Sequence, residues 1–297
     1  MTDLAAQDPV VLFERHRAEQ IRSRRGQTVL AILLFFTFLA FSINMSQFFP
    51  EKLAAGLPKI GDYLYDILPT LELSKLHLDT ETEGSLAYWY FNLPTYLQLL
   101  LQTINMAVFG TLIGAVFGFL LCFPASRNLI RNYWIYFIAR RIMEIARGVP
   151  DVIYALLFVW AFGIGPMAGV FAIAIHSAGA LGKMFAEVNE NVSTGPIEGV
   201  RATGGGWFEE MRFGVVPQVW PNFLSYIWLR LEINIRSSSI IGFVGAGGIG
   251  QELYYVINFN HYEEVSAIVL LVILTVTIVD LISERLRHQA IGKEQLL

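Results

Sequence analysis

Charged and amide side chains interrupt one strongly apolar stretch of the sequence, residues 223–244. Arg230, Glu232, Asn234 and Arg236 follow one another within it. Such groups are costly in contact with lipid, so we expect them to face a bundle interior, an aqueous path or the cytoplasmic interface. Arginine binds carboxylate and phosphate groups through paired hydrogen bonds. The pattern therefore agrees with a path for an anion.

Helical spacing divides these groups between two faces. Arg230 and Asn234 share one face, and Glu232 and Arg236 share another. We predict that Arg236 lies in or beside the anion path, and the alternative is an ion pair with Glu232 that only holds the helix. His176 falls near the middle of a second apolar stretch. Two interpretations of it stay open, a functional group or a core histidine with satisfied hydrogen bonds.

A proline interrupts the long helical pattern of residues 133–160. Pro150 should bend the helix, because proline removes a hydrogen bond at the preceding turn. Arg147 stands three residues before it, with Glu144 and Asp151 at helical spacing on either side. A local charge chain through these three side chains is predicted. One interpretation of the group is the neutralisation of charges near an interface.

Two glycine-containing stretches imitate nucleotide-binding motifs. Residues 245–250 satisfy the dinucleotide pattern G-x-G-x-x-G, but that pattern requires a strand before it and a helix after it in a βαβ unit. Apolar spans surround it instead, so Gly245, Gly247 and Gly248 are expected to form a hinge or a close backbone approach at the mouth of a path. Residues 177–184 lack the first glycine and the final Ser or Thr of a P-loop. No nucleotide site is therefore expected on this chain.

Other reactive residue types are too sparse for catalysis or metal binding. His261, Glu263 and Glu264 stand in a polar connection, which we interpret as a solvated loop. Cys122 is the only cysteine, which excludes an internal disulfide, and we expect it to be a packing residue. The sequence predicts no catalytic residue and no metal site.

The longest polar stretch late in the chain covers residues 196–217. Pro196 is expected just before a short helix, where its fixed φ favours helix initiation. Glu198 is expected in the first turn, where a carboxylate complements the helix N-terminus. Glu198 and Arg201 are three residues apart and can share a face.

The second half of this stretch predicts an elbow and another short helix. Residues 204–206 are glycines, which adopt the left-handed conformation that ends helices. Residues 207–211 can form a second short helix, and Pro217 is expected to stop it. A water-exposed loop of this length between spans is usually functional.

The stretch resembles the Glu-Ala-Ala loop of ABC importer permeases. The resemblance is carried by Glu198-Gly199-Val200, then Gly204, then Val216-Pro217, with Gly199 and Val200 departing from the two alanines of the family pattern. The flanking residues 201–204, 214–219 and 245–250 resemble the phosphonate-uptake branch of these permeases. Together the likeness covers roughly residues 90–285.

The resemblance implies a type I, methionine-importer-like permease core with a coupling loop. The coupling residues toward an ATPase subunit would be Glu198, Gly199, Arg201, Ala202, Gly204 and Pro217. The path or gate would involve Arg147, Pro150, His176, Arg230, Asn234, Arg236, Gly245, Gly247 and Gly248. Implied partners are ABC ATPase subunits that bind ATP and Mg²⁺, a second, identical permease copy and an external substrate-binding protein. The implied substrates are phosphonates, with phosphite or phosphate esters as related candidates.

Composition places the chain in a membrane. Of its 297 residues, 55% are hydrophobic and 15% charged, against about 25% charged in soluble domains. We predict an all-α polytopic membrane protein with six transmembrane helices, and membrane lipid rather than nucleic acid as a further partner. The predicted spans cover residues 27–46, 95–121, 133–160, 167–183, 223–244 and 265–282.

Basic residues set the expected orientation. Five arginines lie in residues 1–26, and more basic residues follow residue 284. Because basic residues mark the cytoplasmic side of a membrane protein, both termini are expected in the cytoplasm. We expect the protein in the inner membrane of a bacterial cell. Residues 47–93 would then be external, with an interfacial helix formed by the apolar residues from 57 to 68. Residues 94–285 would form the permease core, with its cytoplasmic coupling loop at 187–220, and residues 286–297 a cytoplasmic tail.

Two other classes of function compete with a permease subunit that has no ATPase site of its own. A secondary transporter or channel for small anions should show inverted repeats with paired broken helices, and none is visible. An intramembrane enzyme would need a nucleophile with a base, or metal ligands, and no such set is found.

Overall fold

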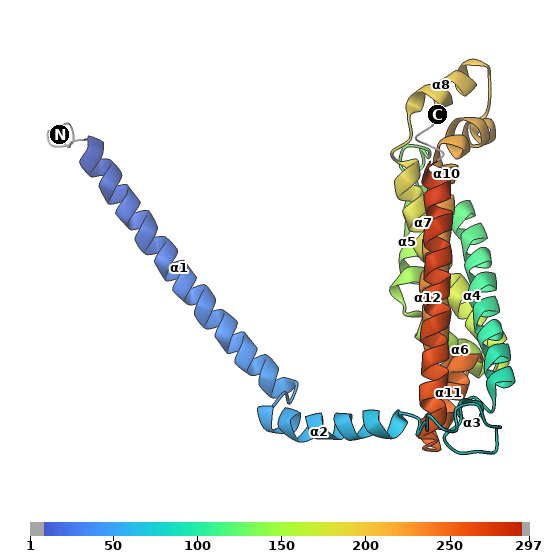
Figure 1. Ribbon diagram of the computed structural model, residues 1–297. Helices are drawn as coiled ribbons and strands as arrows, with labels where there is room; N and C mark the ends of the chain where they lie inside the picture. The colour runs from blue at the N-terminus through green and yellow to red at the C-terminus, as the bar shows by residue number, and fades with distance from the viewer. Residues whose placement is uncertain (1–8, 293–297) are drawn as a thin grey trace. The chain divides into compact units, whose positions relative to one another are not determined.

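The computed structural model describes residues 9–292, and that part of the chain is helical with no strand. The predicted all-α class is therefore confirmed. The chain divides into two compact units, Met1–Tyr65 and Asp66–Leu297. We describe each by itself (Figure 1).

The first unit holds helix α1, Pro9–Met45, and most of helix α2, Pro50–Ile67. Residues 13–45 of α1 are long and apolar enough to cross a membrane. Helix α1 begins at Pro9, within the predicted polar segment 1–26, and continues through residue 26 without a break. Residues 1–8 lie outside the described part of the chain. The predicted helix of residues 57–68 forms as α2, which begins earlier and ends at Ile67. Its place on the membrane surface stays a prediction.

The second unit is a helix bundle. After the four-residue helix α3, Leu86–Trp89, its elements are α4, Leu93–Cys122; α5, Tyr133–Gly148; α6, Asp151–Phe162; α7, Pro166–Asn189; α8, Thr194–Ala202; α9, Trp207–Glu209; the π-helix η1, Glu210–Val215; α10, Val216–Ile241; the 3₁₀-helix η2, Gly242–Val244; α11, Ile249–Asn258; and α12, Tyr262–Gly292. Helix α8 stands at one end of the bundle and α11 at the other (Figure 1).

Four helices of the described chain qualify as membrane spans by length and apolarity, and the number reaches six if two bent pairs each count as one. One pair is α5 with α6, bent by 85°, and the other joins residues 207–244 to α11 with a bend of 45°. The six predicted spans correspond to these elements. Proline explains the first bend, because Pro150 precedes α6 and cannot continue the α5 ladder.

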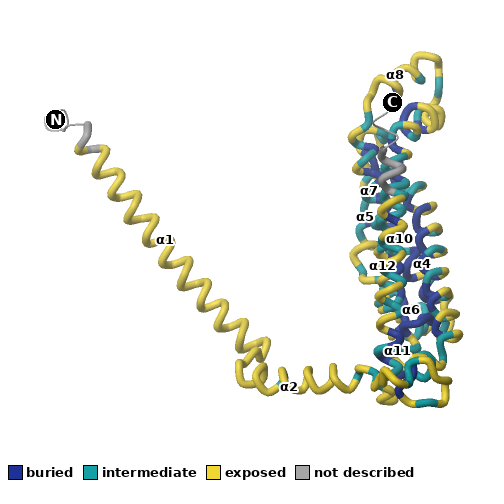
Figure 2. The backbone as a smooth tube through the Cα atoms, in the orientation of Figure 1, coloured by how far each residue is buried: buried dark blue, intermediate teal, exposed yellow. Residues whose placement is uncertain are grey.

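Helices α4 and α7 approach each other so closely that glycine is required between them. A Cβ atom at Gly114 would lie 2.6 Å from the Ser177 Cβ, and one at Gly118 would lie 2.9 Å from the Gly182 backbone nitrogen. Small residues at four-residue spacing permit such contact in lipid. Farther along, the Phe185 and Phe223 rings stack at 4.0 Å between centroids and join α7 to α10. Buried residues lie mainly along these contacts (Figure 2).

Candidate functional site

A polar network crosses the bundle between the middles of α4, α7 and α10. Asn234 donates from Nδ2 to the Thr111 hydroxyl at 2.7 Å and to the Ser177 hydroxyl at 2.8 Å. Arg230 donates from Nε to Ser177 at 3.2 Å and from Nη2 to His176 Nδ1 at 3.1 Å. The predicted shared face of Arg230 and Asn234 is thus confirmed, because both side chains reach Ser177. Three predicted path residues meet here.

In this network His176 accepts a hydrogen bond from Arg230. A guanidinium has no acceptor, so the Nδ1 atom of His176 must accept from Arg230. The imidazole is therefore neutral in this contact and carries its hydrogen on Nε2. Arg230 is partly buried and Asn234 is fully buried. Both interpretations of His176 stay open, since its ring is hydrogen-bonded and also contacts the one cation of the network.

Arg236 lies on a different face of α10. Its Nη2 pairs with Asp280 Oδ2 on α12 at 3.1 Å, and its side chain is 55% exposed. The sequence alternatives were the path or a pair with Glu232; the structure shows an ion pair with Asp280, and a position in the path stays a prediction. Nearby spacing suggested Glu232, but the position of α12 brings Asp280 to the guanidinium.

The charge chain predicted around Arg147 is wrong. Glu144 pairs instead with Arg141 at 2.6 Å. Asp151 accepts hydrogen bonds from the Ser237 hydroxyl and from the Val152 backbone N–H. The 85° bend between α5 and α6 removes the helical register on which the prediction depended. Arg147 remains exposed at the end of α5.

The glycines after α10 adopt left-handed backbone conformations. Gly245, Gly247 and Gly248 have φ of 88°, 83° and 73°, which disfavour other residues. The Gly248 N–H donates to the Gln102 side chain at 3.2 Å, and the Ile249 N–H donates to Thr103 Oγ1 at 2.9 Å. The turn is therefore fastened to α4 at the start of α11.

The predicted two-helix loop with a glycine elbow forms at one end of the bundle. Helix α8 ends at Ala202, and Gly204 follows with φ of 86°. Gly206 has φ of −82°, so the left-handed elbow is at Gly204 rather than at all three glycines. The second helix is longer than expected, because α9 continues through the π-helix η1 into α10.

Three details of this loop differ from the sequence prediction. Pro196 lies inside α8, since the helix begins at Thr194, and Glu198 therefore falls beyond the first turn. Pro217 lies at the start of α10, where the helical backbone continues from η1, and it does not stop a helix. Gly199 and Ala202 lie within α8.

Arg201 pairs across the elbow rather than along its own helix. Its Nε and Nη2 atoms donate to the two Glu210 carboxylate oxygens at 2.8 and 2.9 Å. These hydrogen bonds lower the pKa of the Glu210 carboxyl and raise the pKa of Arg201. A bidentate pair of this kind fixes both position and orientation. The sequence did not predict Glu210 as the partner, because residues nine positions apart are not neighbours on the face of one helix.

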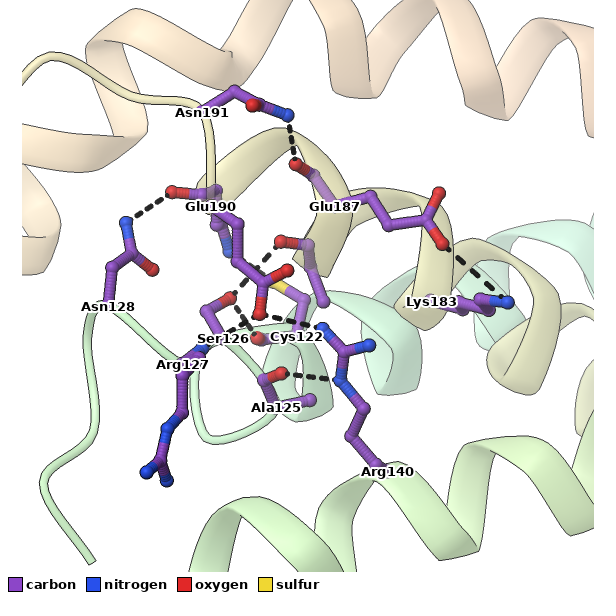
Figure 3. A network of polar contacts seen from close by, with 12 residues as sticks. Cys122, Ala125, Ser126, Arg127, Asn128, Arg140, Lys183, Glu187, Glu190 and Asn191 are labelled. Atoms are coloured by element: carbon purple, nitrogen blue, oxygen red, sulfur yellow. Dashed lines mark hydrogen bonds and ion pairs between the residues drawn. The ribbon is translucent and has the colours of Figure 1, made fainter. Parts of the chain in front are cut away.

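A second missed network lies at the end of the bundle just before the loop (Figure 3). Glu190 follows α7 and accepts from Arg140 Nη2 on α5 at 2.7 Å and from the Arg127 backbone N–H at 2.9 Å. Arg140 also donates from Nε to the Ala125 carbonyl at 3.0 Å. The network joins the ends of α4 and α7 to α5 immediately before α8. Cys122, buried beside it, accepts a weak bond from Asn189 at 3.3 Å.

Comparison with known proteins identifies the fold and the family. A family described as "Binding-protein-dependent transport system inner membrane component" matches residues 110–289. The putative phosphite transport system permease protein HtxC of Stutzerimonas stutzeri is 34% identical over 284 residues, 95% of this chain and 92% of that protein. The phosphate-import permease protein PhnE of Mycolicibacterium smegmatis is 40% identical over 190 residues, 64% of this chain and 36% of that protein.

A solved structure shares the fold. The MetNI methionine ABC transporter, in inward-facing conformations, aligns with a TM-score of 0.57 at 22% identity, covering 66% of this chain and 95% of that chain. The predicted methionine-importer-like core is thus confirmed as a fold. The chain belongs to the family of binding-protein-dependent transport system inner membrane components.

Proposed function

We propose that this chain is the permease subunit of an ATP-driven importer for phosphonates, with phosphite and phosphate esters as related substrates. The observation that carries the proposal is the loop of residues 196–217, a helical projection at one end of a bundle with the family's fold. Relatives named for phosphite and phosphate transport support the substrate class. The network around Arg230, which can bind an oxyanion, supports it independently.

The loop is suited to docking on a separate ATPase subunit. Phe208, beside the elbow, is 78% exposed although it lies beyond the apolar spans. An exposed aromatic group at the tip of a polar loop is a common feature of a binding surface. Glu198, Gly199, Arg201, Ala202, Gly204 and Pro217 would shape this projection. ATP and Mg²⁺ would bind to the partner, so this chain itself would catalyse no hydrolysis.

The complete importer would contain two copies of this chain, two ATPase subunits and an external binding protein. The basic residues near both ends of the chain support cytoplasmic termini in the inner membrane. Residues 47–93 and the end of the bundle near α11 would then face the binding protein. The path would run past the network of His176, Arg230 and Asn234 to a gate near residues 245–248.

Reconstitution in proteoliposomes tests the function. We expect uptake of [¹⁴C]methylphosphonate to require this chain, its cognate ATPase subunit, ATP and loaded binding protein together. Uptake without the ATPase subunit, driven by an ion gradient, would instead identify a secondary transporter. Copurification tests the docking surface, because Phe208→Ala should release the ATPase subunit. Phe259→Ala removes an equally aromatic and 59% exposed side chain beside α11 and should leave the ATPase bound.

A further inference from the structure

The geometry points to Arg230 as the group that binds the transported anion halfway across the membrane, with Ser177 and His176 as positioning residues that hold its guanidinium. This inference rests on the proposed function and specifies where the phosphorus oxyanion is recognised within the chain. The sequence predicted Arg236 in or beside the anion path. We choose Arg230 instead, because Arg236 forms an ion pair with Asp280. By contrast, the hydrogen bonds of Arg230 go to Ser177 and His176.

Arg230 and its contacts lie near the middles of their helices, away from both ends of the bundle. Arg230 lies near the middle of α10, and its contacts His176 and Ser177 lie near the middle of α7. Its side chain is partly buried rather than enclosed. A permanent charge at this depth is not stable against hydrocarbon, so its exposed part must face water or another protein chain. A path between two permease copies satisfies that requirement.

The positive charge of Arg230 has no carboxylate partner within the described residues. Its hydrogen-bond acceptors are a serine hydroxyl and a neutral imidazole. Asp151, whose charge acts on it at longer range, is hydrogen-bonded by Ser237 and the Val152 N–H instead. By contrast, Arg236 pairs with Asp280. A partly buried cation whose hydrogen bonds go only to neutral groups can still accept an external anion as a direct partner.

The two neutral contacts also prepare the guanidinium for a ligand. Ser177 fixes Nε and His176 fixes Nη2, whereas Nη1 has no acceptor in the part of the chain that the structure describes. An oxyanion can therefore accept hydrogen bonds from a planar group whose orientation is already set. One cation with neutral neighbours binds weakly enough to release its ligand, as transport requires.

The test compares single variants of the whole importer in proteoliposomes, with [¹⁴C]methylphosphonate as the probe. Arg230→Gln should lower uptake at least tenfold, while the ATPase subunit still copurifies. Arg141→Gln is the matched control, because this arginine belongs to a surface pair with Glu144, and its uptake should stay within twofold of wild type. Arg236→Gln should lose much less uptake than Arg230→Gln; the reverse order would overturn the choice of Arg230.

Charge rescue separates recognition from folding. In a Cys122→Ser background, Arg230→Cys should be inactive and should regain uptake when a thiol reagent attaches an ammonium group. A reagent of similar size that attaches a sulfonate should give no recovery. Methylphosphonate should slow the modification of the new cysteine, and its neutral dimethyl ester should not. Equal recovery with both reagents would assign Arg230 a purely structural role and refute the inference.

The outcomes distinguish the inference from the proposed function. If the wild-type importer takes up methylphosphonate and Arg230→Gln does so equally well, only the Arg230 site is refuted. If the wild-type importer takes up neither methylphosphonate nor phosphite, the proposed substrate class is refuted, and the Arg230 site for it is refuted with it.

Discussion

Gly204 and Gly199 offer a matched pair of substitutions with opposite expected effects on the loop. A Cβ atom added at either position would meet nothing within 4 Å. The two residues differ only in backbone conformation, because Gly199 lies within α8 and Gly204 has φ of 86°. Alanine should therefore act on the intrinsic stability of α8 and its end, without any change in packing.

The magnitude follows from the backbone alone. Alanine at a left-handed position costs roughly 1–2 kcal/mol, so Gly204→Ala should open the elbow more often. Alanine in a helix interior is about 1 kcal/mol more favourable than glycine, so Gly199→Ala should open α8 less often. The difference of about 2–3 kcal/mol between the variants corresponds to a difference of roughly 30- to 150-fold in the opening equilibrium.

Hydrogen exchange measures the opening equilibrium of the elbow directly, on the permease in nanodiscs without the ATPase subunit. The reporters are the N–H groups of Thr203, Gly204 and Gly205, which bond to carbonyls of residues 200 and 201. Exchange by local opening follows the opening equilibrium. We expect roughly five- to thirtyfold faster exchange in Gly204→Ala and about fivefold slower exchange in Gly199→Ala. Slower exchange in both variants would show that residue 204 is not left-handed and would refute the reasoning.

Three further predictions concern the rest of the chain. Glu190→Gln should lower the free energy of unfolding by about 1–3 kcal/mol, because a partly buried arginine loses its charged partner; denaturation of the purified permease measures this. Gly250→Ala should abolish folded protein, since its Cβ would overlap the Ser239 carbonyl oxygen, whereas Gly61→Ala meets no atom within 4 Å and should express normally. A cysteine placed in residues 47–93 should react with an impermeant reagent on intact cells; reaction only after lysis would contradict the orientation.

The elements that depend on local sequence patterns could be predicted from the sequence. Runs of apolar residues specify the spans, because backbone groups in lipid must be satisfied within the helix. Pro150 predicted the break between α5 and α6, and the glycines predicted the elbow after α8. Each of these features depends on residues close to one another in the chain.

Side-chain partners were not predictable in the same way. Arg201 pairs with Glu210, and Arg236 pairs with Asp280, because the chain folds back and brings separate helices together. The spacing of residues along the sequence does not predict such contacts. Thr111 joins the network around Asn234 from another helix, and a hydroxyl residue in an apolar span carries no distinctive signal. His176 and Arg230 were both recognised as unusual, but their contact required the packing of α7 on α10.

Helix α7 links the proposed anion site to the loop that would meet the ATPase. His176 contacts Arg230 near the middle of α7, and Glu190 anchors its end. The packing of α7 against α4 leaves no room for larger side chains at Gly114, so the pair should move as one body. The Ser193 N–H, just before α8, bonds to Gln218 at the start of α10 at 3.1 Å. A shift of α10 relative to α7 on anion binding would therefore displace both ends of the loop together.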